Sequence, residues 1–174
     1  MVATAGAALA LGAGVAWWRI AGRGSPSSDA DALFALTFDD ADGVAQPLAR
    51  WRGTLLVVNF WATWCAPCVD EMPELNRVRV EYRSRGVEVI GIGIDGRERI
   101  RAFRERHGIG FPLLVAGVGG GELARRLGSP ASVLPYTLLV TPDGTIAQRR
   151  VGRIQEHELR AWLDTRTGYR RGRR

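Results

Sequence analysis

Lysine is absent from this sequence, so all of its positively charged side chains are arginines. The formal net charge is +6, and such a charge could suit nucleic acid or an anionic membrane surface. The arginines, however, are spread along the chain between aspartates and glutamates, and the one dense cluster lies in a basic tail over residues 166–174. A charged run at a chain end is usually solvated. We therefore expect no nucleic-acid partner.

Cysteine and histidine are scarce, with two of each. Two cysteines exclude the disulfide scaffold of small secreted proteins. Cys65 and Cys68 form a single C-x-x-C, and His107 and His157 lack the spacing of zinc ligands. We therefore expect no metal site, and we predict that both histidines lie on helix surfaces. A chain of 174 residues can bury a hydrophobic core without disulfide crosslinks.

Charge is also missing from residues 2–18, which are mostly small and apolar and end in two tryptophans. This composition is typical of a signal peptide or a short membrane anchor. We predict a signal or anchor segment over residues 1–21, which would reach the inner membrane through residues 2–18. A linker over residues 22–32 would join it to a domain over residues 33–165. Arginine follows the apolar run but does not precede it, so we also expect a basic region upstream of the first residue.

Hydrophobic periodicity places the elements of the domain. We predict strands over residues 33–38, 54–60, 87–94, 111–116, 137–140 and 145–151. We predict helices over residues 66–83, 97–107, 122–127 and 156–163. The strand over residues 54–60 is a continuous apolar run, which is typical of a buried central strand, and we predict that the strand over residues 87–94 is buried as well. The last two strands form a hairpin across Thr141-Pro-Asp-Gly. This order predicts an α/β fold with a mixed central sheet and helices on both faces.

Cys65 and Cys68 come where an apolar strand ends and a helix begins. Free N–H groups and partial positive charge at a helix N-terminus stabilise a thiolate. We therefore predict that Cys65 has a lowered pKa and is the attacking nucleophile. Cys68 lies three residues on, on the same helix face, and would be the less exposed resolving thiol. Pro67 fits the first helical turn, where a missing N–H costs nothing.

Two other interpretations of this pair are a structural disulfide and two ordinary buried cysteines. The first would close a ring too small to remove much entropy from the unfolded chain. The strand-to-helix position argues against the second. We favour dithiol redox chemistry, with the Cys65–Cys68 disulfide as the redox-active group and no bound cofactor.

The segment VVNFWATWCAPCVDEMPEL resembles the active-site signature of thioredoxin-like proteins of the TlpA/ResA type. The resemblance covers residues 31–165 and includes FDDADG before the first core strand, the extra βα unit near residues 87–107, and SVLPYTLLVTPDG. It implies a thioredoxin-like fold and a bacterial thiol–disulfide oxidoreductase that is periplasmic or otherwise extracytoplasmic, either anchored in the inner membrane or exported.

The resemblance also implies roles for particular residues. Pro135 matches the cis-proline that packs beside the two sulfurs, and Trp64 is a supporting residue before the nucleophile. Pro73 matches the proline that kinks the active-site helix. Glu71 matches an acidic residue that could accept a proton from Cys68, although it could equally be a favourable charge in the first helical turn.

Two further positions differ from ordinary thioredoxin. Asn59 stands where thioredoxin has a buried aspartate, and because an amide cannot take a proton, any general base must lie elsewhere. Tyr136, after the matched cis-proline, is bulkier than the small residue often found there, so we expect it to narrow the substrate groove.

The expected function is reduction of disulfides in exported proteins. The resemblance suggests apocytochrome c thiols or the copper-site cysteines of oxidases as clients. Ala66-Pro67 lacks the histidine of strongly oxidising members of the fold, which favours reduction. A reductase in an oxidising compartment needs outside electrons, so we expect a membrane thiol–disulfide electron donor as a partner.

Two alternatives belong to other classes. A peroxidase of the peroxiredoxin type would have threonine three residues before the reactive cysteine, within P-x-x-x-T-x-x-C, whereas Thr63 is two before Cys65 and no such proline precedes it. A copper carrier could use Cys65, Cys68 and Met72 as soft ligands on one helical turn, although no nearby histidine completes the site and Met72 also suits the core.

Overall fold

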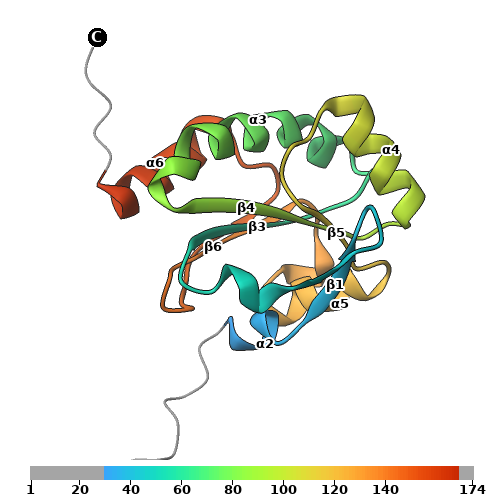
Figure 1. Ribbon diagram of the computed structural model, residues 1–174, viewed down its shortest axis with the longest axis horizontal. Helices are drawn as coiled ribbons and strands as arrows, with labels where there is room; N and C mark the ends of the chain where they lie inside the picture. The colour runs from blue at the N-terminus through green and yellow to red at the C-terminus, as the bar shows by residue number, and fades with distance from the viewer. Residues whose placement is uncertain (1–29, 169–174) are drawn as a thin grey trace, which may run out of the picture.

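The computed structural model describes residues 30–168, which form a seven-stranded sheet covered by helices on both faces (Figure 1). The strands are β1 (Thr37–Asp40), β2 (Ala45–Pro47), β3 (Leu55–Trp61), β4 (Val87–Gly93), β5 (Leu113–Val115), β6 (Tyr136–Val140) and β7 (Ile146–Val151). The α-helices are α2 (Asp31–Phe34), α3 (Ala66–Tyr82), α4 (Arg97–His107), α5 (Gly119–Arg126) and α6 (Glu156–Thr167). Short 3₁₀ turns cover Leu48–Trp51, Arg83–Arg85 and Pro130–Ser132.

The strands follow the order β2-β1-β5-β4-β3-β6-β7 across the sheet. β3 pairs in parallel with β4, and β4 with β5, whereas the remaining pairs are antiparallel. All seven residues of β3 are buried, because helices cover both faces of this central strand. The mixed central sheet with helices on both faces is therefore confirmed.

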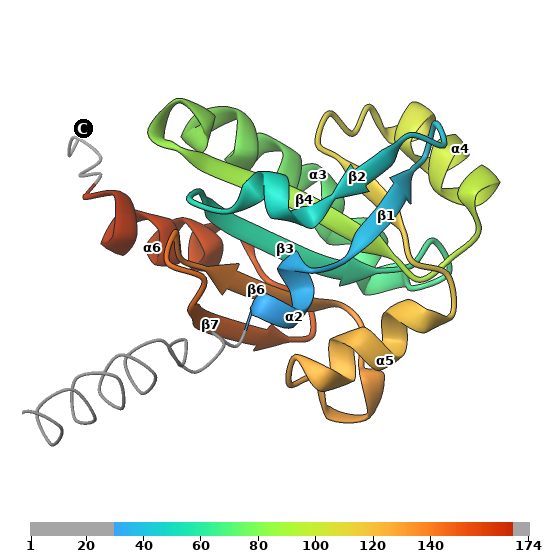
Figure 2. The same cartoon turned by 60° about the horizontal axis from the view of Figure 1, so that its bottom comes forward.

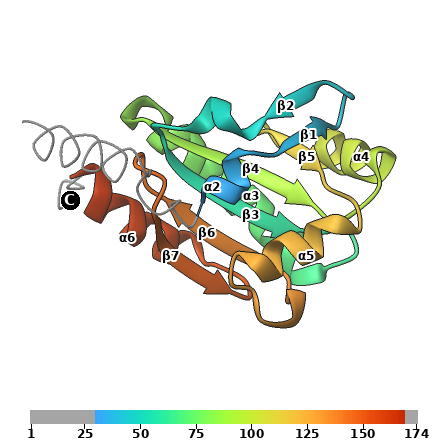
Figure 3. The ribbon, with the colours of Figure 1, turned by 90° about the horizontal axis from the view of Figure 1, so that it is seen from below.

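Each face of the sheet has its own core. Helices α3, α4 and α6 cover one face and α2 and α5 the other (Figure 1). The views turned toward the bottom of the molecule bring α2 and α5 in front of the sheet (Figures 2 and 3). Successive β3 residues alternate between the two cores, with Val57 and Trp61 on the α3 side and Val58 and Phe60 on the other. This alternation follows from the two-residue period of a strand, and it directs the side chain of Asn59 toward α3.

The strand predicted over residues 33–38 is wrong in its first part. Leu33 and Phe34 belong to α2 and are both buried in the core on the α5 side; a strand would have pointed these neighbours to opposite faces. The strand starts only at Thr37, and it forms a hairpin with β2. β2 was not predicted, because a strand of three residues is too short to show a period. Gly43, with φ +86°, makes the turn.

The other predicted elements are present: the helix predicted over residues 97–107 has the bounds of α4, and the remaining elements have shifted ends. The helix predicted over residues 122–127 begins three residues earlier, at Gly119, because three glycines form its first turn despite their low helix propensity. Residues 31–32 and 166–167 also belong to helices, at the two ends of the described chain.

The predicted signal or anchor segment over residues 1–21 lies outside the described residues. Among residues 30–168, no helix is both long enough and apolar enough to span a membrane.

Candidate active site

Cys65 and Cys68 lie where β3 ends and α3 begins. β3 ends at Trp61, three residues continue the chain, and Cys65 is the N-cap residue of the helix. The two cysteines form a disulfide with a Cα–Cα separation of 5.2 Å. Cys65 retains 8% of its surface exposed and Cys68 none. Of the two cysteines, Cys65 is therefore the one that an incoming molecule can reach.

The first turn of α3 shapes the electrostatics of the pair. The Cys65 carbonyl accepts hydrogen bonds from the backbone N–H groups of Cys68 and Val69, both at 3.0 Å. Pro67 lies in this turn, where a backbone N–H would have no partner within the helix, so the absence of one in proline costs no hydrogen bond. The partial positive charge at the start of this 17-residue helix favours a thiolate at its N-cap.

Pro135 lies immediately before β6. The Leu134–Pro135 peptide bond is cis, and Pro135 immediately precedes Tyr136, which pairs with Phe60 near the end of β3. The Pro135 carbonyl accepts a hydrogen bond from Gly152 N–H at 2.9 Å. Pro135 and the segment that leads to Cys65 therefore lie at the same end of the sheet.

Glu71 lies on α3 one turn after Cys68 and is completely buried. One carboxylate oxygen accepts a hydrogen bond from Asn59 Nδ2 at 2.6 Å, and the other accepts one from Ile154 N–H at 2.9 Å. Asn59 Nδ2 also donates to Thr137 Oγ1 at 3.0 Å. Glu71 therefore lies beyond the first helical turn, and it belongs to a buried polar network with Asn59 and Thr137.

Burial raises the pKa of Glu71 to about 7, although the hydrogen bonds from Ile154 and Asn59 and the charge of Arg153 partly oppose this shift. A carboxyl with this pKa can gain or lose a proton near neutral pH. Asn59 cannot titrate. Within the network, Glu71 is therefore the group able to exchange a proton.

Thr137 and Ile154 were missed by sequence reasoning. Thr137 lies directly opposite Asn59 in the β3–β6 register, so a polar residue in the otherwise apolar strand YTLLV was the available signal. Ile154 contributes only its backbone N–H, and no sequence pattern marks such a contact.

Asp95 was also missed, and it fixes the segment before Cys65. Its side chain is fully buried after β4. One carboxylate oxygen accepts a hydrogen bond from Thr63 Oγ1, and the other accepts from Gly96 N–H and Arg99 Nε. Burial alone would raise the pKa of Asp95, but these hydrogen bonds outweigh it and hold the pKa below its ordinary value. An aspartate directly after a buried apolar strand was the sequence signal.

The side chain of Tyr136 does not narrow the groove, and that expectation was wrong. Tyr136 is completely buried against Phe60 in the core on the α5 side, and its hydroxyl donates to the Leu127 carbonyl at 2.8 Å. Met72 is buried too, in the core on the α3 side that also contains both cysteines. Trp64, by contrast, is 68% exposed beside Cys65.

Residues 29–149 match the model of the AhpC/TSA family. The chain belongs to the AhpC/TSA family. A curated relative, the thiol-disulfide oxidoreductase ResA of Bacillus thuringiensis subsp. konkukian, is 30% identical over 125 residues, which cover 71% of this chain and 70% of the relative. The resemblance to thioredoxin-like oxidoreductases of the TlpA/ResA type is thus confirmed, and this AhpC/TSA family member is an enzyme of the thiol–disulfide oxidoreductase class.

Solved structures of low sequence identity support the thioredoxin-like fold. A thiol:disulfide interchange protein of Chlorobium tepidum matches with a TM-score of 0.66 at 24% identity, covering 76% of this chain and 93% of its own. A secreted disulfide oxidoreductase of Mycobacterium tuberculosis matches with a TM-score of 0.66 at 22% identity, covering 78% and 98%. A mutant form of peroxiredoxin Q of Xanthomonas campestris also matches, at 19% identity and a TM-score of 0.66, covering 78% and 94%. The fold is therefore shared by disulfide oxidoreductases and a peroxiredoxin.

Proposed function

We propose that this enzyme reduces disulfides in exported proteins, with Cys65 as the nucleophile and Cys68 as the resolving thiol. The observation that carries the proposal is the arrangement along α3: a partly accessible cysteine at the N-cap, a buried cysteine one turn on, and a buried carboxyl one turn further. Each position suits one step of thiol–disulfide exchange.

The reaction begins with the reduced enzyme. The Cys65 thiolate attacks one sulfur of the client disulfide, and the other client sulfur leaves as a thiolate and takes a proton. Cys68 then loses its thiol proton to Glu71, and its thiolate attacks the Cys65 sulfur. The second client thiolate leaves, and the enzyme retains the Cys65–Cys68 disulfide. Two electrons have passed to the client, and a thiol–disulfide electron donor must restore the dithiol.

Asn59 supports both protonation states of Glu71. With Glu71 ionised, Asn59 Nδ2 donates to it. Once Glu71 has taken the proton of Cys68, the carboxyl oxygen that faces Asn59 becomes a donor. Asn59 Oδ1 is a buried atom without a hydrogen-bond partner among the described residues, and rotating the amide by 180° would present it as the acceptor.

Three observations support the direction and the place of the reaction. Ala66-Pro67 between the cysteines lacks a histidine that would favour oxidation. Residues 2–18 carry no charge, and one similar structure belongs to a secreted protein. We place the enzyme outside the cytoplasm, tethered or exported through this segment. By resemblance we infer that its clients are cytochrome c or oxidase copper-site cysteines, and that its electron donor is a membrane thiol–disulfide transporter.

The reduction potential of the Cys65–Cys68 couple tests the direction. Equilibration with glutathione or dithiothreitol buffers, followed by thiol counting, should give a value near that of thioredoxin, about −270 mV. A value near about −120 mV, typical of a strong oxidant, would overturn the reductase proposal. The reduced enzyme should also reduce insulin.

The alternative functions have separate tests. In a peroxidase, Thr63 would be needed at the reactive sulfur, but its hydroxyl donates to Asp95; catalytic consumption of hydrogen peroxide would nevertheless favour that function. A copper carrier would need the side chain of Met72, which is buried. Formation of a one-to-one Cu(I) complex that blocks insulin reduction would favour the carrier.

A further inference from the structure

A groove of about 380 Å³ runs beside the cysteine pair, between the start of α3 and α4. Its α3 side is made by the residues that flank the nucleophile, and its other side by one face of α4. The lining includes Thr63, Val69, Arg99, Phe103, Arg106 and His107. No step of the proposed relay uses this groove.

The groove is lined by residues on both sides of the nucleophile in the sequence, Thr63 and Val69. Thr63 lies two residues before Cys65, and Val69 lies one helical turn after it, with its backbone N–H bonded to the Cys65 carbonyl at 3.0 Å. This wall therefore offers one surface for the part of a client chain that neighbours the cysteine attacked by Cys65. Asp95 keeps Thr63 in position by accepting its hydroxyl hydrogen bond.

The α4 side of the groove combines an apolar side chain, Phe103, with the positively charged Arg99 and Arg106. Arg99, Phe103 and Arg106 recur at intervals of four and three residues, so they share one face of the helix. Phe103 stacks on the His107 ring with centroids 4.3 Å apart. The acidic residues of α4, Glu98 and Glu105, are not among those that line the groove.

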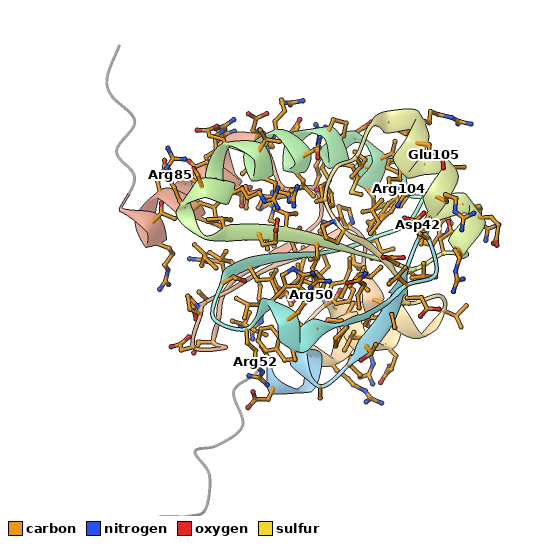
Figure 4. All side chains as sticks on the ribbon, in the orientation of Figure 1. Asp42, Arg50, Arg52, Arg85, Arg104 and Glu105 are labelled. Carbon is orange, nitrogen blue, oxygen red and sulfur yellow. A yellow bond between two sulfur atoms is a disulfide. The ribbon has the colours of Figure 1, made fainter. Side chains whose placement is uncertain are left out.

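The arginines of α4 differ in whether they already form an ion pair with an aspartate of the protein. Arg97 pairs with Asp39. Arg104 pairs with Asp42 on the β1–β2 turn, and Figure 4 labels both residues. Arg99 pairs with the buried Asp95 while its own side chain stays 71% exposed. Arg106 is exposed and forms no ion pair within residues 30–168. The charge of the groove that remains available to a ligand is therefore concentrated at Arg106.

We propose that this groove binds the client segment next to the attacked cysteine and selects an acidic side chain beside an apolar one. The apolar side chain would pack on Val69 and Phe103, and the carboxylate would meet Arg106, whose guanidinium matches a carboxylate with two parallel hydrogen bonds. The proposal rests on the proposed reduction of client disulfides. Because the groove is open to water, we expect kcat/KM for the acidic segment to exceed that for its neutral counterpart by about two- to fivefold.

Three disulfide-bonded fluorogenic peptides, identical except for Glu-Leu, Gln-Leu or Lys-Leu next to the attacked cysteine, test this proposal at low ionic strength. For the wild-type enzyme, kcat/KM should be highest for the Glu-Leu peptide and lowest for the Lys-Leu peptide, and the difference should lie in KM. Added salt should make the three kcat/KM values more alike. Arg106→Gln should remove the order and Arg106→Glu should reverse it. Arg166→Glu is the matched control, because Arg166 is an exposed arginine near the far end of α6, and it should keep the wild-type order.

The outcomes separate this proposal from the one on which it rests. If the wild-type enzyme reduces all three peptides equally well, or if Arg106→Glu keeps the wild-type order, the groove does not select clients while the reductase function stands. If the wild-type enzyme reduces none of the three peptides and no insulin, the proposed function itself fails.

Discussion

Glu71 is the buried group in this site whose charge changes near neutral pH. A carboxyl with a pKa of about 7 is partly ionised where the enzyme works, so it can take the proton that Cys68 must lose. Glu71→Gln keeps the shape and one of the two hydrogen-bond acceptors but cannot take a proton. We expect insulin reduction to slow by about tenfold or more, with loss of the inflection near pH 7 in the rate profile. Unchanged rates and an unchanged profile would remove Glu71 from the relay.

The same carboxyl makes folding stability depend on pH. The folded pKa lies above the unfolded value of 4.5, so the folded state holds its proton more tightly. Stability from this group is complete below about pH 4.5 and is lost as the pH rises through 7, by roughly 3 kcal/mol at most. In urea titrations of the oxidised protein, Glu71→Gln should be more stable than wild type at pH 8 and nearly equal at pH 4.5. An equal difference at both pH values would contradict this.

Cys65 has the accessible position that attack on a client requires. Cys65→Ser replaces the thiol by a hydroxyl, which does not form a thiolate, so insulin reduction should be lost while the far-ultraviolet circular dichroism stays unchanged. Cys68→Ser should lose turnover as well but keep single attack on a reactive disulfide dye. Full insulin reduction by Cys65→Ser would show that another group attacks.

The connection between β4 and α4 holds the segment that precedes the nucleophile. Asp95 there accepts hydrogen bonds from Thr63, Gly96 and Arg99. Asp95→Ala would remove the buried carboxylate that accepts all three hydrogen bonds, and we expect a loss of about 1–3 kcal/mol in the free energy of unfolding. Asp70→Ala, which removes an exposed aspartate from α3, should change it by less than about 0.5 kcal/mol. Equal effects of the two substitutions in urea titrations would show that the Thr63–Asp95 contact contributes little.

The long elements could be predicted because each carries a strong pattern. β3 and β4 are mostly apolar runs, and the inward residues of α3 recur every three or four positions. The short elements carry too few residues for a period to show. LFALTF contains enough apolar and β-branched residues for a strand, yet its first two residues form a helical turn because both reach the same core.

Site residues could be predicted where they belong to a recognisable sequence motif, and not where their role depends on contacts between distant parts of the chain. The C-x-x-C motif, Pro135 and Asn59 could be assigned because their spacing matches a family signature. Whether Glu71 is buried could not be decided, because burial comes from the chain at Ile154, 83 residues away along the sequence. The expectation that Tyr136 narrows the substrate groove was wrong because it rested only on the neighbouring Pro135. The side chain of Tyr136 lies in the core on the α5 side of the sheet.

The whole molecule is expected to work outside the cytoplasm, attached through residues 2–18. This apolar segment and the oxidative chemistry of an extracytoplasmic compartment are consistent with each other. An alkaline phosphatase fusion after Arg174 should be active in a bacterial host, because that reporter needs disulfides that form only after export. A fusion to a reporter that works only in the cytoplasm should be inactive, and the opposite pattern of the two fusions would overturn this location.

The relay between Cys65 and Cys68 is tested most directly by removing the resolving thiol. Exchange creates a mixed disulfide between Cys65 and the client, and its release needs a second thiol. The sequence contains no third cysteine, so Cys68→Ala leaves that intermediate without an internal exit. Captured from an extracytoplasmic extract and analysed by mass spectrometry, Cys68→Ala should carry client peptides linked to Cys65, released by dithiothreitol and absent from Cys65→Ser/Cys68→Ala. If Cys68→Ala captures nothing that the double variant does not, the two-cysteine relay is wrong.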